Sequence, residues 1–196
     1  MNNMARMPVL FVGHGNPMNA LVQNAYTEGW NELGRTSPRP RAILVISAHW
    51  YLPRIAVTAA EQPRTIHDFG GFPRALFEYQ YLARGDASVA REVQLQLQPL
   101  EVALDAQWGL DHGAWAVLCH MYPEADVPVL QLSIDETLPA QRHYQIGRQL
   151  APLRERGILI LGSGNIVHNL HTYAWVNTNK RRMTGPRASS NEFASA

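Results

Sequence analysis

Three of the eight histidines stand just after apolar runs of the kind that form buried strands. In chain order these are His14 after residues 7–12, His49 after residues 42–46, and His168 after residues 158–161. Continuous apolar runs rich in β-branched residues are typical of parallel strands, which are buried on both faces. Ligands of open α/β sheets bind at the carboxyl ends of such strands. If the strands are parallel neighbours, we expect the three imidazoles to converge at one edge of the sheet.

Three neutral imidazole nitrogens are a suitable ligand set for a divalent transition metal. None of the pairs among His14, His49 and His168 has a local ligand spacing such as H-E-x-x-H, so the prediction depends on their place at strand ends. The alternative is three independent histidines, each hydrogen-bonded in its own surroundings. The residues alone leave both interpretations open.

A fourth histidine, His112, lies between Asp111 and Gly113, directly before the apolar stretch 114–121, which we expect to be helical. The N-terminus of a helix favours negative charge. A histidine at such a point suits a group that accepts and returns a proton. We therefore predict an acid/base role for His112, with an ordinary turn residue as the alternative.

Three aromatic residues are candidates for the wall of a pocket that receives a flat substrate: Trp50, Phe69 and Phe72. Each has a plain alternative, which is packing in the core or in a surface loop. The glycine-rich turn at residues 162–165 is not a phosphate loop, because it lacks the G-x-x-x-x-G-K-[ST] pattern. We expect its glycines to leave space for His168, and we expect His171 to lie outside the first set of ligands.

Short apolar runs alternating with helical patterns predict one α/β domain, with a mostly parallel central sheet flanked by helices and an active site at the carboxyl ends of its strands. We place this domain at residues 1–175. One helix is expected to begin with Asn19 as its cap and to end at Gly34, and another to extend over residues 139–156. Residues 176–196 are polar, basic and aperiodic, which predicts a poorly packed tail.

Composition restricts the class of protein. The formal net charge is +1 and the basic excess lies in the tail, so nucleic-acid binding is not indicated. No apolar run is long enough to span a bilayer, and no signal peptide is recognisable. The single cysteine, Cys119, rules out an internal disulfide, and we expect it to be a buried thiol in a cytoplasmic protein.

Four ordered motifs resemble those of the DOPA 4,5-dioxygenase-type extradiol ring-cleaving dioxygenases, in the class III superfamily of the protocatechuate 4,5-dioxygenase β-subunit. The motifs occupy residues 13–17, 47–50, 109–113 and 162–169, and the loop at residues 68–73 is similar too. Together they extend over most of the expected domain.

The resemblance implies a single α/β domain that holds non-haem Fe²⁺ or, in some bacterial members, Zn²⁺. It implies that His14, His49 and His168 lie at the metal and that His112 is the acid/base residue. The substrates would be O2 and a catechol such as DOPA, whose ring opens beside the two hydroxyl groups. The alternatives are a zinc-dependent hydrolase and an inactive metal-binding product.

The chain departs from this family at its C-terminal end. Family members continue for several tens of residues and supply a late histidine close to the metal, whereas residues 176–196 do not resemble that part. We therefore expect the C-terminal part to be truncated or altered.

Overall fold

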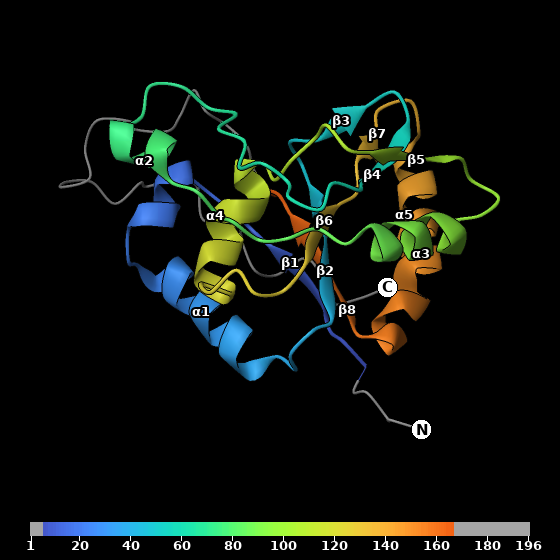
Figure 1. Ribbon diagram of the computed structural model, residues 1–196, viewed down its shortest axis with the longest axis horizontal. Coiled ribbons are helices and arrows are strands. Elements are labelled where there is room, and N and C mark those ends of the chain that lie inside the picture. Colours follow the sequence, from blue (N-terminus) through green and yellow to red (C-terminus); the bar gives the residue numbers. More distant parts are fainter. Residues whose placement is uncertain (1–5, 167–196) are drawn as a thin grey trace, which may run out of the picture. The chain divides into compact units, whose positions relative to one another are not determined.

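A four-stranded parallel sheet crosses the centre of residues 6–166, the part of the chain that the computed structural model describes (Figure 1). The strands, in spatial order, are β1 (Val9–Val12), β8 (Ile158–Ser163), β2 (Ala42–Ser47) and β6 (Val129–Gln131). The predictions for His168, for His171 and for the tail at residues 176–196 lie outside the described residues.

The strands at the centre of the sheet, β2 and β8, are more buried than the edge strand β1. β2 and β8 are apolar along most of their length and are buried on both faces, as expected for parallel strands covered on two sides. Within residues 6–166, β1 pairs only with β8, and its residues Val9 and Phe11 are exposed. All three pairings in this sheet are parallel, so the carboxyl ends of its strands meet at one edge.

Helices cover both faces of the sheet (Figure 1). One group packs with the core around Trp115, and the other packs with the core around Leu97. The first group is η1 (Pro17–Leu21), α1 (Ala25–Thr36), α2 (Arg74–Glu78) and α4 (His112–Met121). The second group is α3 (Ala87–Gln96), α5 (Ala140–Leu150) and η2 (Ala151–Arg156). The predicted α/β class, with a parallel sheet flanked by helices, is confirmed.

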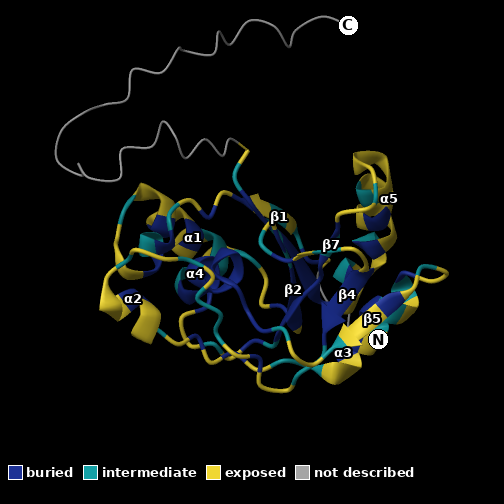
Figure 2. Cartoon of the chain, turned by 90° about the horizontal axis from the view of Figure 1, so that it is seen from above, coloured by how far each residue is buried: buried dark blue, intermediate teal, exposed yellow. Residues whose placement is uncertain are grey.

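Two small parallel sheets extend the strand layer. β3 (Tyr51–Leu52) pairs with β7 (Ile134–Asp135), and β4 (Ile55–Thr58) pairs with β5 (Val102–Asp105). Figure 2 shows how burial is distributed, with buried residues concentrated in strands such as β2 and β4 and in α4. None of the helices within residues 6–166 combines the length and the apolar character needed to cross a membrane.

The start of the first helical region differs from the prediction. Asn19 caps no helix; it lies inside η1, and its side-chain amide donates to the His14 carbonyl at 3.1 Å. Asn16 caps η1, and Asn24 caps α1 by accepting from two backbone N–H groups. The prediction was wrong because three asparagines in this stretch satisfy the same local rule, and the turn geometry decides among them.

The predicted helix end at Gly34 was also wrong, since α1 continues to Thr36. Gly34 lies where α1 approaches α4, and a Cβ built on it would be 2.0 Å from the Met121 carbonyl oxygen. The glycine therefore permits a close contact between two helices. The other predicted helix, at residues 139–156, is divided into α5 and η2, and Pro152 stands in the first turn of η2, where it cannot donate a backbone hydrogen bond.

Candidate metal centre

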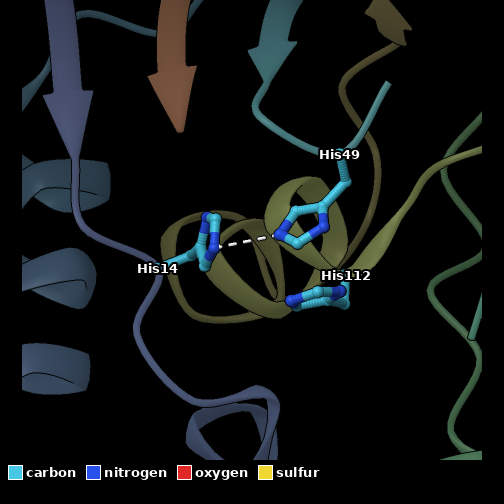
Figure 3. Close-up of side chains that lie close together, drawn as sticks. All are labelled: His14, His49 and His112. Carbon is cyan, nitrogen blue, oxygen red and sulfur yellow. Dashed lines mark hydrogen bonds between the residues drawn. The ribbon is translucent and has the colours of Figure 1, made fainter. Parts of the chain in front are cut away.

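His14 and His49 come together because β1 and β2 are parallel and flank β8. Each histidine stands two residues past the end of its strand, at the same edge of the sheet. The ladder continues into both loops: the Ala48 N–H donates to the Ser163 carbonyl at 2.9 Å, and the Gly164 N–H donates to the Val12 carbonyl at 3.1 Å. The Nε2 atoms of His14 and His49 lie 3.1 Å apart (Figure 3).

His112 reaches the same place from a different element, since it is the first residue of α4. Its ring centroid is 4.0 Å from that of His49 and 5.3 Å from that of His14. A possible ligand atom from each of the three residues lies within 4.8 Å of the others, and Figure 3 shows the rings grouped around one space. The structure thus brings together His14, His49 and His112, while His168 lies outside the described residues.

The separation of the two Nε2 atoms fits a shared metal ion. Two ligands at the usual zinc–nitrogen distance and a tetrahedral angle would be about 3.3 Å apart, close to the observed 3.1 Å. Imidazole is a common ligand of zinc and iron. The donor set therefore suits a divalent transition metal at His14 and His49. The position of His112 is compatible with a ligand and with an acid/base residue beside the ion.

The ring orientation of His14 is fixed by Ser163, the last residue of β8. The Ser163 hydroxyl donates its one hydrogen to the Gly113 carbonyl at 2.5 Å. It can therefore only accept from His14 Nδ1, which lies 3.0 Å away. In the neutral ring the proton is then on Nδ1, and the Nε2 lone pair is directed toward His49.

Asp68 contacts the other two imidazoles with one carboxylate. Its Oδ1 accepts from the His112 backbone N–H at 3.0 Å and from His112 Nδ1 at 2.9 Å. Its Oδ2 lies 3.3 Å from His49 Nδ1. Burial alone would raise the pKa of Asp68, but the hydrogen bonds and charge of His112, with a further contribution from His49, outweigh it and lower the pKa.

A second carboxylate, Asp111, lies fully buried beneath the histidines. It accepts from the Ser47 hydroxyl at 2.7 Å, from the Gln131 amide at 2.7 Å and from the Ala114 N–H at 3.2 Å. Burial raises the pKa of Asp111, against the lowering effect of the bonds from Ser47 and Gln131. This network joins the ends of β2 and β6 to the start of α4, and so fixes the element that carries His112.

The three predicted pocket aromatics lie in different surroundings. Phe69 packs edge-on against His112 with centroids 5.6 Å apart, and Phe72 packs edge-on against Phe69 at 5.4 Å. Trp50 is 1% exposed and stacks on Trp108 at 5.5 Å, so its ring packs in the protein interior. The substrate-contacting role of all three stays a prediction.

Sequence reasoning missed the side chains that hold the rings. Ser163 was interpreted only as part of a glycine-rich turn, and Asp68 only as part of a similar loop. Gln131 carried a usable signal, since it is a lone amide in an otherwise apolar stretch that forms β6. Such a residue needs a buried hydrogen-bond partner, and Asp111 is that partner.

The fold and the site together define an α/β protein with a histidine centre at the carboxyl edge of a parallel sheet. Residues 8–190 match the family model described as the catalytic LigB subunit of aromatic ring-opening dioxygenase. The chain belongs to this family.

Individual relatives agree with the family. The chain is 54% identical, over 87% of its length, to a protein of Escherichia coli K12 named 4,5-DOPA dioxygenase extradiol, and 43% identical, over 81% of its length, to one of the same name from Beta vulgaris. The crystal structure of an uncharacterized Escherichia coli K12 protein aligns with a TM-score of 0.75 and 48% identity over 88% of this chain. The chain spans 63% and 61% of the two named relatives and 65% of the crystallised chain.

Proposed function

We propose that this chain carries the catalytic centre of an extradiol dioxygenase that opens the ring of a catechol such as DOPA. The observation that carries the proposal is the convergence of His14, His49 and His112 at one edge of the sheet, within 4.8 Å of one another. Membership of the aromatic ring-opening family supports the reaction class. The names of the relatives from Escherichia coli and Beta vulgaris support DOPA as the catechol.

His14 and His49 would hold the divalent metal, together with His168. A bound Fe²⁺ would supply open coordination positions and the redox change that the reaction with O2 needs, which Zn²⁺ would not supply because it has no accessible redox change. The chain's contribution is to present imidazole lone pairs. Ser163 and Asp68 do this by occupying the Nδ1 side of His14 and His49, respectively.

His112 is the proposed acid/base residue. Its Nδ1 is held by Asp68, so Nε2 remains the atom that can take a proton from a catechol hydroxyl and later return it. The Asp68 carboxylate also stabilises the imidazolium that forms when His112 gains this proton, as the aspartate does in a serine protease triad. Phe69, packed against the His112 ring, would limit the access of water from that side.

We also propose that the protein acts in the cytoplasm. The support is its single cysteine, Cys119, which is a buried free thiol and suits a reducing compartment. The proposed small-molecule substrates, a catechol and O2, require no macromolecular partner.

The decisive experiment loads the metal-free protein with Fe²⁺ under anaerobic conditions and then adds L-DOPA in air. We expect O2 consumption together with formation of a ring-opened semialdehyde, seen by its visible absorbance and by mass spectrometry with both atoms of labelled O2 incorporated. The protein should also bind Zn²⁺, but the zinc-loaded form should consume no O2. Bound Fe²⁺ with no O2 uptake on L-DOPA or on simple catechols would contradict the proposal.

A further inference from the structure

Asp68 is the one described residue whose side chain contacts the Nδ1 side of two of the three grouped histidines. It lies in the loop between β4 and α2, and its side chain is 20% exposed. Oδ1 receives two hydrogen bonds from His112, one from the backbone and one from the ring, and Oδ2 lies 3.3 Å from His49 Nδ1. The two oxygens of one carboxylate are thus divided between two imidazoles.

This arrangement determines which nitrogen of each neutral ring carries the proton. An ionised carboxylate has no hydrogen and can only accept. His112 must therefore present Nδ1–H to Asp68. For His49, whose Nδ1 lies 3.3 Å from Oδ2, a proton on Nδ1 makes this contact attractive, whereas a lone pair there would face the negative oxygen. Each neutral ring has one further nitrogen with a lone pair, and this is Nε2 in both cases. For His49, that atom is the one 3.1 Å from His14 Nε2.

We propose that Asp68 is a positioning residue that sets the tautomer and orientation of His49 and His112 together, so that both present Nε2 to the centre. Ser163 does the same for His14 alone. The consequence for metal binding depends on the proposed function, whereas the tautomers are properties of this chain's own side chains. Removing such a supporting hydrogen bond costs about 10–100-fold in metal affinity in other proteins.

Asp68→Asn separates this role from simple tethering of the loop. The backbone N–H of His112 can only donate, so the amide oxygen of the variant must face His112. The amide nitrogen is then placed against His49 Nδ1 and donates to it. His49 must accept there, which moves its proton to Nε2, while His112 keeps Nδ1–H. The loop stays bonded to α4, but one Nε2 lone pair is lost.

Asp86→Asn is the matched control. Asp86 caps α3 by accepting from the Ser88 and Val89 N–H groups. Asparagine is as good a cap as aspartate. The control therefore makes the same chemical change on the other side of the sheet and should leave the histidines unchanged.

The test combines two measurements on the full chain, with the two variants compared at a pH where the rings are neutral. Long-range ¹H–¹⁵N spectra of the metal-free, histidine-labelled protein report the tautomer of each ring. Competition with a chromophoric chelator gives the Zn²⁺ affinity. We expect Nδ1–H on His49 and His112 in the original protein and in Asp86→Asn. In Asp68→Asn we expect Nε2–H on His49 and a Zn²⁺ affinity lower by about 10–100-fold, with unchanged circular dichroism.

Three results would overturn the inference. The first is an Nε2–H tautomer on His49 or His112 in the original protein, which decides the question even if Asp68→Asn does not fold. The second is unchanged His49 tautomer in a folded Asp68→Asn. The third is a shifted tautomer with unchanged Zn²⁺ affinity. If the original protein bound no Zn²⁺ or Fe²⁺ at all, the proposed function would fail, and the tautomers would still decide the role of Asp68.

Discussion

The coupling between packing at the start of α4 and the placement of the histidines can be tested by adding a single methyl group at Gly113. It is the second residue of α4, and a Cβ built on it would lie 2.5 Å from Ser47 Oγ and 3.1 Å from both Asp111 Oδ1 and His49 Cδ2. The first of these distances is too short for a real contact. The Gly113→Ala methyl group must therefore displace the Ser47 hydroxyl, which is the donor to Asp111.

The expected cost follows from these contacts. Overpacking a well-packed interior costs about 1–3 kcal/mol, and a weakened hydrogen bond to buried Asp111 adds about 1 kcal/mol. Alanine is a better helix former than glycine by about 1 kcal/mol, which offsets part of this. We expect Gly113→Ala to lower the free energy of unfolding by about 1–3 kcal/mol, measured by urea denaturation. Zinc affinity should fall as well, because the His49 ring must move.

Gly147→Ala provides the matched control, since it is also a glycine in a helix. Nothing lies within 4 Å of a Cβ built on Gly147 in α5. This variant should be more stable than the original by about 0.5–1 kcal/mol and should bind zinc equally well. If Gly113→Ala matched Gly147→Ala in both measurements, the reasoning about Ser47 and His49 would be refuted.

Three further predictions concern single side chains. Purified protein should retain zinc or iron, and His14→Ala or His49→Ala should abolish retention, measured by elemental analysis; equal metal content in all three proteins would reject these residues as ligands. His112→Ala should keep the metal and lower the ring-cleavage rate by about 10²–10⁴-fold, whereas loss of metal would make His112 a ligand. Burial, only partly opposed by a hydrogen bond with Tyr79, raises the pKa of the Cys119 thiol to about 12. Cys119 should therefore resist a thiol reagent at pH 8 until the chain unfolds in urea, and rapid labelling of the folded protein would show that this site opens.

The position of the centre could be predicted from the sequence because it depends on local patterns. Apolar runs identified β1, β2 and β8, and the proximity of His14 and His49 follows from the rule that parallel strands end at one edge. The proximity of His112 did not follow from a strand. Its motif indicated a helix start, and the placement of α4 against β2 brought it to His49.

The hydrogen bonds that orient the rings could not be predicted, because their partners are far apart in the chain. His14 and Ser163 are separated by 149 positions, and Asp68 and His112 by 44. Serine is common at strand ends and aspartate in loops, and no local pattern distinguishes Ser163 and Asp68 from others. The same limit explains Gly34. The local rule predicts a helix end there, but the residue is a glycine because α1 approaches the Met121 backbone in α4 too closely for a side chain.

The N-terminus of α4 links stability to the proposed chemistry. The first N–H groups of a helix have no partner within the helix, and here two of them donate to different carboxylates. The His112 N–H donates to Asp68, and the Ala114 N–H donates to Asp111. Asp111 in turn accepts from Ser47 at the end of β2, so the helix start is attached to the strand that leads to His49. Because the hydrogen bonds that cap α4 also determine where the His112 and His49 rings lie, this helix start cannot shift without moving the centre.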